Sequence, residues 1–220
     1  MPRPREGYKI DGERVPGVST VTGRFKDPGG LYWWHWEQGK AGKDFRETRD
    51  AAADAGILCH NMIEADWYGK EFHISRFSAH IVEKASHAFL GYLEWKEQTQ
   101  LRIIHPELSL LSRKHMFGGT LDAIMVSGKL RLGDWKTSGG IYPDMLVQVG
   151  GGYALLWEEN YPDEPLDGLE IIRFSKPESL DDPISFHHHY YSAEILPICK
   201  RQFLLWRESY DLDKRLKKLI

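Results

Sequence analysis

The feature that most constrains the fold is a glycine turn midway between two aspartates. Ser127-Gly128-Lys129 separates two apolar-rich runs, a pattern typical of a β-hairpin. Asp122 and Asp134 lie equally far from Gly128 in the sequence. A hairpin folded about Gly128 therefore places the two carboxylates opposite each other, with their Cβ atoms about 5 Å apart.

The same hairpin brings a lysine next to the two acids. Lys136 follows Asp134 by two residues, so strand alternation returns its side chain to the same face, while Trp135 points the other way. Two carboxylates this close repel each other unless a cation lies between them. Carboxylate oxygens are hard ligands that suit Mg²⁺, so the pattern predicts a divalent metal site beside a lysine.

Composition limits the remaining possibilities. With 220 residues, of which 41% are hydrophobic, the chain can bury the core of a single domain. The net charge of −3 gives no overall basic field, so a site for a polyanion must be local. Cys59 and Cys199 form no CxxC pair, which argues against a disulfide framework, a zinc ribbon or a four-cysteine iron–sulfur cluster. No stretch predicts a signal peptide or a membrane span.

The periodicity of the chain predicts an α+β or α/β domain covering residues 1–220. Residues 16–100 form a largely helical, substrate-guiding portion, 101–191 a catalytic sheet core and 193–219 a C-terminal helix. Further helices are expected over 31–55, 54–68, 78–98 and 143–160, and further strands over 8–10, 13–15, 101–111, 169–174 and 184–191. His187-His188-His189 lies in the last strand, where alternation prevents all three side chains from facing one ion.

A histidine upstream completes a candidate metal site. His60 and Glu64 lie four residues apart on the predicted helix 54–68 and share a face. His60, Asp122 and Asp134, with the backbone carbonyl of Trp135, would suit Mg²⁺ or Mn²⁺. Lys136 would stabilise the negative charge that develops on the phosphate or orient the attacking water. A metal site beside such a lysine is suited to phosphodiester hydrolysis. The chain has no Gly-rich phosphate loop of the P-loop kind.

Several motifs, taken in order, resemble the PD-(D/E)XK nuclease superfamily, in its RecB-like exonuclease branch of phage and bacterial type. Residues 56–60 resemble the helix motif with a metal-binding histidine, 119–122 the first acidic motif and 134–137 the D-x-K core. Gln148 and Tyr153 resemble the glutamine-and-tyrosine helix, and residues 16–21 with Leu31 and Trp34 resemble the N-terminal segment of phage and mitochondrial exonucleases. The paired cysteines of the iron–sulfur members are absent from this sequence.

The resemblance implies a restriction-endonuclease-like fold, with a central mixed sheet, flanking helices and a helical N-terminal elaboration. It implies a Mg²⁺-dependent deoxyribonuclease, an exonuclease acting on DNA ends or single strands in recombination, repair or phage DNA processing. One or two Mg²⁺ ions are expected, with Mn²⁺ as a substitute and no iron–sulfur cluster. DNA is the expected partner, together with recombination or replication proteins, in the cytoplasm of a bacterial or phage-infected cell and away from membranes. The alternatives are a structure-specific or restriction-like endonuclease, a catalytically weak DNA-binding subunit, or action on RNA.

Other candidate residues have two interpretations each. Gln148 orients a nucleobase, a phosphate or a metal-bound water, or makes only a polar contact at the helix. Glu64 supports His60 or belongs to a solvated face. Glu107 reaches the metal from a neighbouring strand or is an ordinary strand-edge charge, and Tyr153 is a packing residue with a polar group. DNA contacts are assigned to Ser19, Thr20, Trp34 and Lys176.

Overall fold

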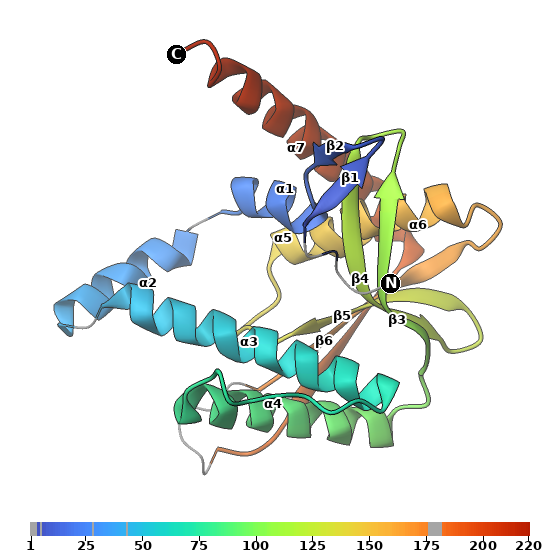
Figure 1. Cartoon of the computed structure of the whole chain (residues 1–220). Coiled ribbons are helices and arrows are strands. Elements are labelled where there is room, and N and C mark those ends of the chain that lie inside the picture. The colour runs from blue at the N-terminus through green and yellow to red at the C-terminus, as the bar shows by residue number, and fades with distance from the viewer. Residues whose placement is uncertain (1–3, 5, 28, 43, 176–181) are drawn as a thin grey trace.

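A five-stranded mixed β-sheet forms the centre of the computed structural model, which describes residues 4, 6–27, 29–42, 44–175 and 182–220 (Figure 1). Across the sheet, the strands are β3 (Arg102–Ser112), β4 (Phe117–Val126), β5 (Leu130–Lys136), β6 (Leu166–Phe174) and β7 (Phe186–Ser192). β5 and β6 run parallel, while the other neighbouring pairs are antiparallel. The predicted class, a central mixed sheet flanked by helices, is confirmed.

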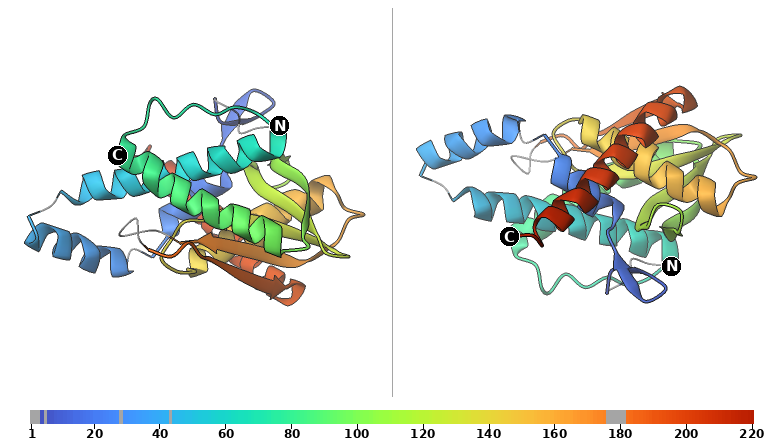
Figure 2. Two further views of the ribbon diagram at one scale, coloured as in Figure 1. Left: turned by 90° about the horizontal axis from the view of Figure 1, so that it is seen from below. Right: turned by 90° about the horizontal axis from the view of Figure 1, so that it is seen from above.

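Two sets of helices cover the two faces of this sheet (Figure 2). One face packs against α3 (Phe45–Tyr68) and α4 (Ala79–Gln98). On the other side lie α1 (Val18–Phe25), the crossover helices α5 (Pro143–Leu146), η1 (Val147–Tyr153) and α6 (Ala154–Asn160), the short turn η2 (Ala193–Ile195) and α7 (Leu196–Leu216). The crossover helices follow from the parallel pair, because parallel strands cannot be joined by a tight turn. No helix in the described part of the chain has the length and apolarity that crossing a membrane requires.

The β4–β5 hairpin folds about Gly128 as the sequence predicts. Its register runs from Val126 opposite Leu130 to Ala123 opposite Gly133, so Asp122 and Asp134 are the next residues in line. Gly128 has φ +77°, in the left-handed region that glycine adopts without a steric cost. The Trp135 side chain points away from Asp134, into the core under α4, where its ring lies 5.0 Å from that of Trp95.

The N-terminal third agrees with the prediction in its first hairpin but not in its helices, since α1 was not predicted as a separate helix. The hairpin of β1 (Tyr8–Ile10) and β2 (Glu13–Val15) is confirmed. The single helix expected over residues 31–55 is wrong, because the chain breaks after α2 (Gly29–Lys40) and restarts at α3. Gly42 has φ +68°, and the Asp44 side chain caps α3 by accepting the Arg46 N–H at 2.8 Å. As a result α2 extends away from the sheet (Figure 2).

Three consecutive glycines let α7 and α1 pack closely against η1. A Cβ atom on Gly151 would lie 2.5 Å from the carbonyl oxygen of Cys199, and one on Gly152 would lie 2.4 Å from Val18. Both distances are shorter than side chains tolerate, so glycine is required here for close packing. The segment around these glycines is a π-helix, a conformation with one extra residue per turn that is frequent at functional sites.

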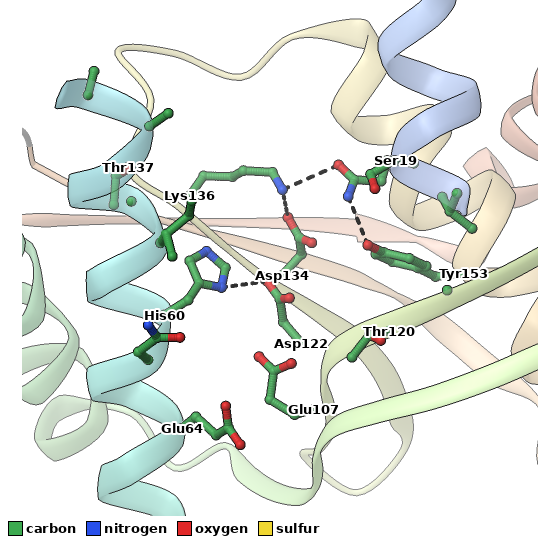
Figure 3. Close-up of a pocket in the computed structure, with 18 of the residues that line it drawn as sticks. Ser19, His60, Glu64, Glu107, Thr120, Asp122, Asp134, Lys136, Thr137 and Tyr153 are labelled. Carbon is green, nitrogen blue, oxygen red and sulfur yellow. Dashed lines mark hydrogen bonds and ion pairs between the residues drawn. The ribbon is translucent and has the colours of Figure 1, made fainter. Parts of the chain in front are cut away.

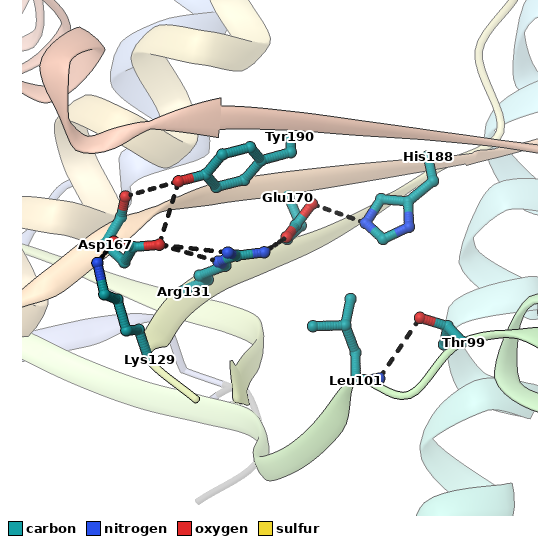
Figure 4. Close-up of polar contacts among 8 residues, drawn as sticks. All are labelled: Thr99, Leu101, Lys129, Arg131, Asp167, Glu170, His188 and Tyr190. Carbon is teal, nitrogen blue, oxygen red and sulfur yellow. Dashed lines mark hydrogen bonds and ion pairs between the residues drawn. The ribbon is translucent and has the colours of Figure 1, made fainter. Parts of the chain in front are cut away.

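A cluster of polar side chains lies on the face of the sheet that packs against α4 (Figure 4). The carboxylate of Glu170 is buried, and it accepts a hydrogen bond from Arg131 Nη1 at 2.6 Å while His188 Nε2 lies 2.6 Å from its other oxygen. His187 and His189 point the other way, with their rings 6.4 Å apart. The prediction that the three histidines cannot face one ion is therefore confirmed.

Candidate metal centre and catalytic pocket

A pocket of about 490 Å³ opens between α3, the N-terminus of α1 and the sheet (Figure 3). Most of the predicted site residues lie in its wall, although they come from six different helices and strands. They are Ser19, His60, Glu64, Glu107, Asp122, Asp134, Lys136, Gln148 and Tyr153.

Three acidic residues from neighbouring strands form a row along this pocket. Pro106 pairs with Ala123 and Leu108 with Leu121, so Glu107 lies opposite Asp122 in the β3–β4 register. Asp122 in turn precedes the Ala123–Gly133 pair, which brings it towards Asp134. The acidic row therefore crosses β3, β4 and β5 at one level of the sheet. Three carboxylates cannot stay ionised together in one pocket without a compensating cation.

His60 joins the row from the opposite wall. It projects from α3 towards the sheet (Figure 3), and its Nδ1 lies 3.6 Å from Asp122 Oδ2. One ligand atom each from His60, Glu107 and Asp122 lies within 4.8 Å of the other two. This separation, and the mixture of imidazole and carboxylate, suits a divalent cation with water completing its shell. The structure thus brings Glu107 into the group that the sequence assigned to His60, Asp122, Asp134 and Trp135.

Asp134 and Lys136 form an ion pair at the bottom of the pocket. Asp134 is fully buried, and one of its oxygens contacts the Lys136 ammonium. Burial raises the pKa of Asp134 from 3.8 to about 7, with the nearby Asp122 adding to the rise and Lys136 opposing it. Burial alone would lower the pKa of Lys136, but Asp134 and Asp122 outweigh it, so the Lys136 pKa rises and the ammonium stays charged.

The hydrogen bonds of Asp134 and Asp122 show which carboxylate oxygens could bind a cation. Among the described residues, Asp134 Oδ1 is buried without any hydrogen-bond partner. Asp122 is better supported, because its Oδ2 accepts the backbone N–H of Trp135 at 3.0 Å. A buried carboxylate oxygen with no donor is unfavourable, and a bound divalent ion relieves that cost. The residues present therefore fit a metal ion, and the Trp135 carbonyl stays a proposed additional ligand.

The π-helix links Lys136 to two further residues. Gln148 Oε1 accepts a hydrogen bond from Lys136 Nζ at 3.4 Å, and Gln148 Nε2 donates to the Tyr153 hydroxyl at 2.9 Å. These residues are five apart, which is the spacing that aligns side chains on a π-helix. The π-helix therefore brings Gln148 and Tyr153 to the same face, although their spacing is one residue longer than the spacing that aligns side chains on an α-helix. The Gln148 amide is thus a second partner of the Lys136 ammonium, in addition to Asp134.

Two hydroxyl groups that were not predicted as site residues, those of Tyr8 and Thr120, also line the pocket. Thr120 Oγ1 lies 2.8 Å from the Tyr8 hydroxyl and 2.7 Å from Ser109 Oγ. Thr120 precedes Asp122 by two residues, so strand alternation was a usable signal for it. Tyr8 comes from the distant β1, and only the tertiary packing of that hairpin on Gly118 brings it here.

The four residues predicted to contact DNA do not all lie in the pocket wall. Ser19 lines the pocket. Thr20 is exposed on α1 outside the pocket wall, and Trp34 lies on α2 with its ring 5.4 Å from that of His35. Lys176 lies outside the described residues. Of the three members of this set that the structure describes, Ser19 alone lines the pocket of the acidic row.

No family model matches the chain, and no curated protein matches it. Among solved structures, LHK-Exo in complex with dAMP is similar with a TM-score of 0.37 and 11% identity, over 76% of this chain and 85% of the other. An alkaline exonuclease (LHK-Exo) from Laribacter hongkongensis gives 0.34 and 13%, over 76% and 85%. SSO0001 gives 0.31 and 16%, over 70% and 74%. Likenesses this distant carry no weight for function, which is inferred below from the site.

The backbone of Glu107 adopts a left-handed conformation that is unfavourable for a residue with a side chain. Its φ of +49° lies in the left-handed region, which costs a non-glycine residue about 1 kcal/mol or more. Glu107→Gly removes this strain and the carboxylate together. We expect the free energy of unfolding to rise by about 1 kcal/mol relative to Glu107→Gln. Urea unfolding measures the difference, and equal stability of the two variants would show that φ is not strained at this position.

Both Glu107 variants should lose affinity for the metal. Each removes one of the three ligand groups gathered within 4.8 Å. Calorimetric titration with Mn²⁺ is expected to give weaker binding by about tenfold or more for both, because a carboxylate ligand carries formal charge as well as an oxygen atom. Binding as tight as that of the unaltered chain would exclude Glu107 as a ligand.

The buried Asp134 predicts how metal-free stability depends on pH. Its pKa is about 7 in the folded chain, against 3.8 when exposed. A raised folded pKa means that the folded state holds the proton more tightly, so stability present below pH 4 is lost as the pH rises to about 7. We expect unfolding in EDTA to become easier across this window. Asp134→Asn should flatten that dependence, and an unchanged pH profile would contradict the assignment.

Proposed function

We propose that the chain is a divalent-metal-dependent nuclease that hydrolyses phosphodiester bonds in DNA. The observation that carries this proposal is the acidic row of Glu107, Asp122 and Asp134, which shares one open pocket with His60 and Lys136. Carboxylates arranged to hold a cation, next to a fixed ammonium, are the groups that phosphodiester hydrolysis needs. The pocket is partly open to solvent, as a site that acts on a polymer strand requires.

The residues have distinct roles in this proposal. Glu107, Asp122, His60 and Asp134 would hold Mg²⁺ or Mn²⁺, which when bound supplies a Lewis acid and a water of lowered pKa. Lys136 would place its positive charge beside the scissile phosphate, where negative charge develops in the transition state. Gln148 fixes the direction of the ammonium through its hydrogen bond at 3.4 Å.

DNA as the substrate, and attack from an end, rest on the order of motifs that resembles the RecB-like exonuclease branch. Overall charge does not oppose this choice, since the local site can hold the strand through its metal. Exonuclease action on ends or single strands is therefore the preferred activity. A structure-specific endonuclease would use the same chemistry on an internal bond.

A degradation assay with a circular control tests the proposal. Linear single and double strands labelled at either end are incubated with Mg²⁺, beside a closed circular single strand. We expect products from the linear substrates only, with the order of label release giving the polarity. Cleavage of the circle would replace the exonuclease assignment with an endonuclease. No product from any substrate, with Mg²⁺ or Mn²⁺, would overturn the nuclease proposal.

A further inference from the structure

A row of basic side chains continues from Lys136 across the other half of the sheet. Lys136 pairs with Arg173 in the β5–β6 register, and Arg173 pairs with His187 in the β6–β7 register. The neighbouring residues Trp135, Phe174 and Phe186 belong to the core beneath α3 and α4. Strand alternation therefore turns Lys136, Arg173 and His187 to the opposite face, the face of Asp134. With strands about 4.8 Å apart, the row reaches roughly 10 Å beyond the catalytic lysine.

The Arg173 guanidinium forms no ion pair with the part of the chain that the structure describes. No carboxylate lies in ion-pair distance of it among the described residues, and its Nη1 donates to the carbonyl oxygens of Ser138 and Gly139 at 3.3 and 3.2 Å. Its Nε is buried without a hydrogen-bond partner in the described part of the chain. Arg131, on the other face, instead contacts the carboxylates of Asp167 and Glu170. Arg173 is thus held beside the loop that follows Lys136, with donor capacity left over.

Two histidines lie beside Arg173 on this face of the sheet. His187 and His189 lie on the same face of β7, with their rings 6.4 Å apart, and His187 is exposed. Within the described residues, His189 Nε2 is also buried without a hydrogen-bond partner. His188 belongs to the other face, where it contacts Glu170. Arg173, His187 and His189 form what we call the basic row.

We propose that the basic row binds a backbone phosphate of the nucleic acid strand, next to the phosphate held at the acidic row. The inference rests on the proposed function, because it assumes a strand entering the pocket. Within the described residues the Arg173 guanidinium has no acidic partner, and a phosphate is a strong acceptor for the N–H groups that Ser138 and Gly139 leave unused. In a chain of net charge −3, the Arg173 guanidinium supplies a local attraction that the overall charge does not. A strand crossing the sheet from β4 to β7 would pass the acids, then Lys136, then the basic row.

Binding without cleavage tests this subsite. The probe is a fluorescein-labelled fifteen-nucleotide oligo-dT in Ca²⁺, with a gel to verify that it stays intact, and anisotropy is recorded over a range of KCl concentrations. Arg173→Ala should weaken binding roughly three- to tenfold and lower the log–log salt slope by about 0.7, the value for one phosphate contact on a single strand. Arg173→Lys should keep the slope of the unaltered chain. Adding His187→Ala and His189→Ala to Arg173→Ala should weaken binding beyond the effect of Arg173→Ala alone.

A matched arginine elsewhere provides the control. Arg102 is exposed at the start of β3, at the other end of the sheet, so Arg102→Ala should leave affinity and slope unchanged. An unchanged slope for Arg173→Ala would overturn the proposal, even if affinity fell, because Arg173 would then only support the loop at Ser138. If the unaltered chain cleaves DNA in Mg²⁺ but Arg173→Ala leaves the salt slope unchanged, the phosphate subsite is wrong and the nuclease proposal stands. If Arg173→Ala lowers the slope but the unaltered chain never cleaves DNA, the nuclease proposal is wrong and the phosphate subsite stands.

Discussion

Asp134→Asn is expected to slow cleavage of DNA in Mg²⁺ by about a thousandfold. Asparagine keeps the size of the side chain but removes the charge that would hold the metal and orient Lys136. The change also removes a buried carboxylate whose Oδ1 has no donor among the described residues. In EDTA at pH 8 the variant should also unfold more easily than the unaltered chain, because asparagine leaves the buried Lys136 ammonium without its carboxylate partner.

The control for this prediction is Asp167→Asn. Asp167 pairs with Lys129 and Arg131 on the opposite face of the sheet, outside the pocket. Its replacement should leave single-turnover cleavage unchanged. The measurement is the single-turnover rate on a labelled linear strand, with melting temperature followed at increasing Mg²⁺. Mg²⁺ should raise the melting temperature of the unaltered chain and of Asp167→Asn, but much less that of Asp134→Asn. Full activity of Asp134→Asn would remove Asp134 from the mechanism.

The position of Asp122 and Asp134 could be predicted from the sequence because one turn decides it. A hairpin has a fixed register once its turn is known, and Gly128 marked the turn. The same arithmetic applied to the turn before β4 would have placed Glu107 opposite Asp122. Pro106 obscured that step, since proline inside a run argues against a central strand. β3 is an edge strand, where proline is tolerated.

The arrangement of Gln148 and Tyr153 could not be read from local preference. A spacing of five residues separates side chains on an α-helix, and a π-helix is too rare to be expected. The three glycines were the available sign, but their cause is tertiary. They admit Cys199 and Phe203 of α7, which lie far along the chain. Such a contact has no signature in the residues around Gln148 themselves.

Lys136→Met is expected to raise the affinity for divalent metal while lowering the cleavage rate about a hundredfold. The ammonium contacts Asp134 and repels any cation held nearby, so its loss leaves the carboxylates more strongly attractive to Mg²⁺. The same loss removes the positive charge proposed to face the scissile phosphate. Without metal, Asp134 loses the partner that stabilises its charge, and at pH 8 the variant should be less stable by about 3 kcal/mol.

The two effects of Lys136→Met separate a catalytic lysine from a structural one. Saturating Mg²⁺ should restore its melting temperature but not its cleavage rate, because the ion can replace the charge that Asp134 needs but not the one that Lys136 supplies. Lys136→Arg is the matched variant, since it keeps the charge and should bind metal as the unaltered chain does. If Lys136→Met bound Mn²⁺ more weakly in calorimetry, Lys136 would be arranging the ligands rather than opposing the ion. If Mg²⁺ restored cleavage along with stability, its charge would serve only to neutralise Asp134.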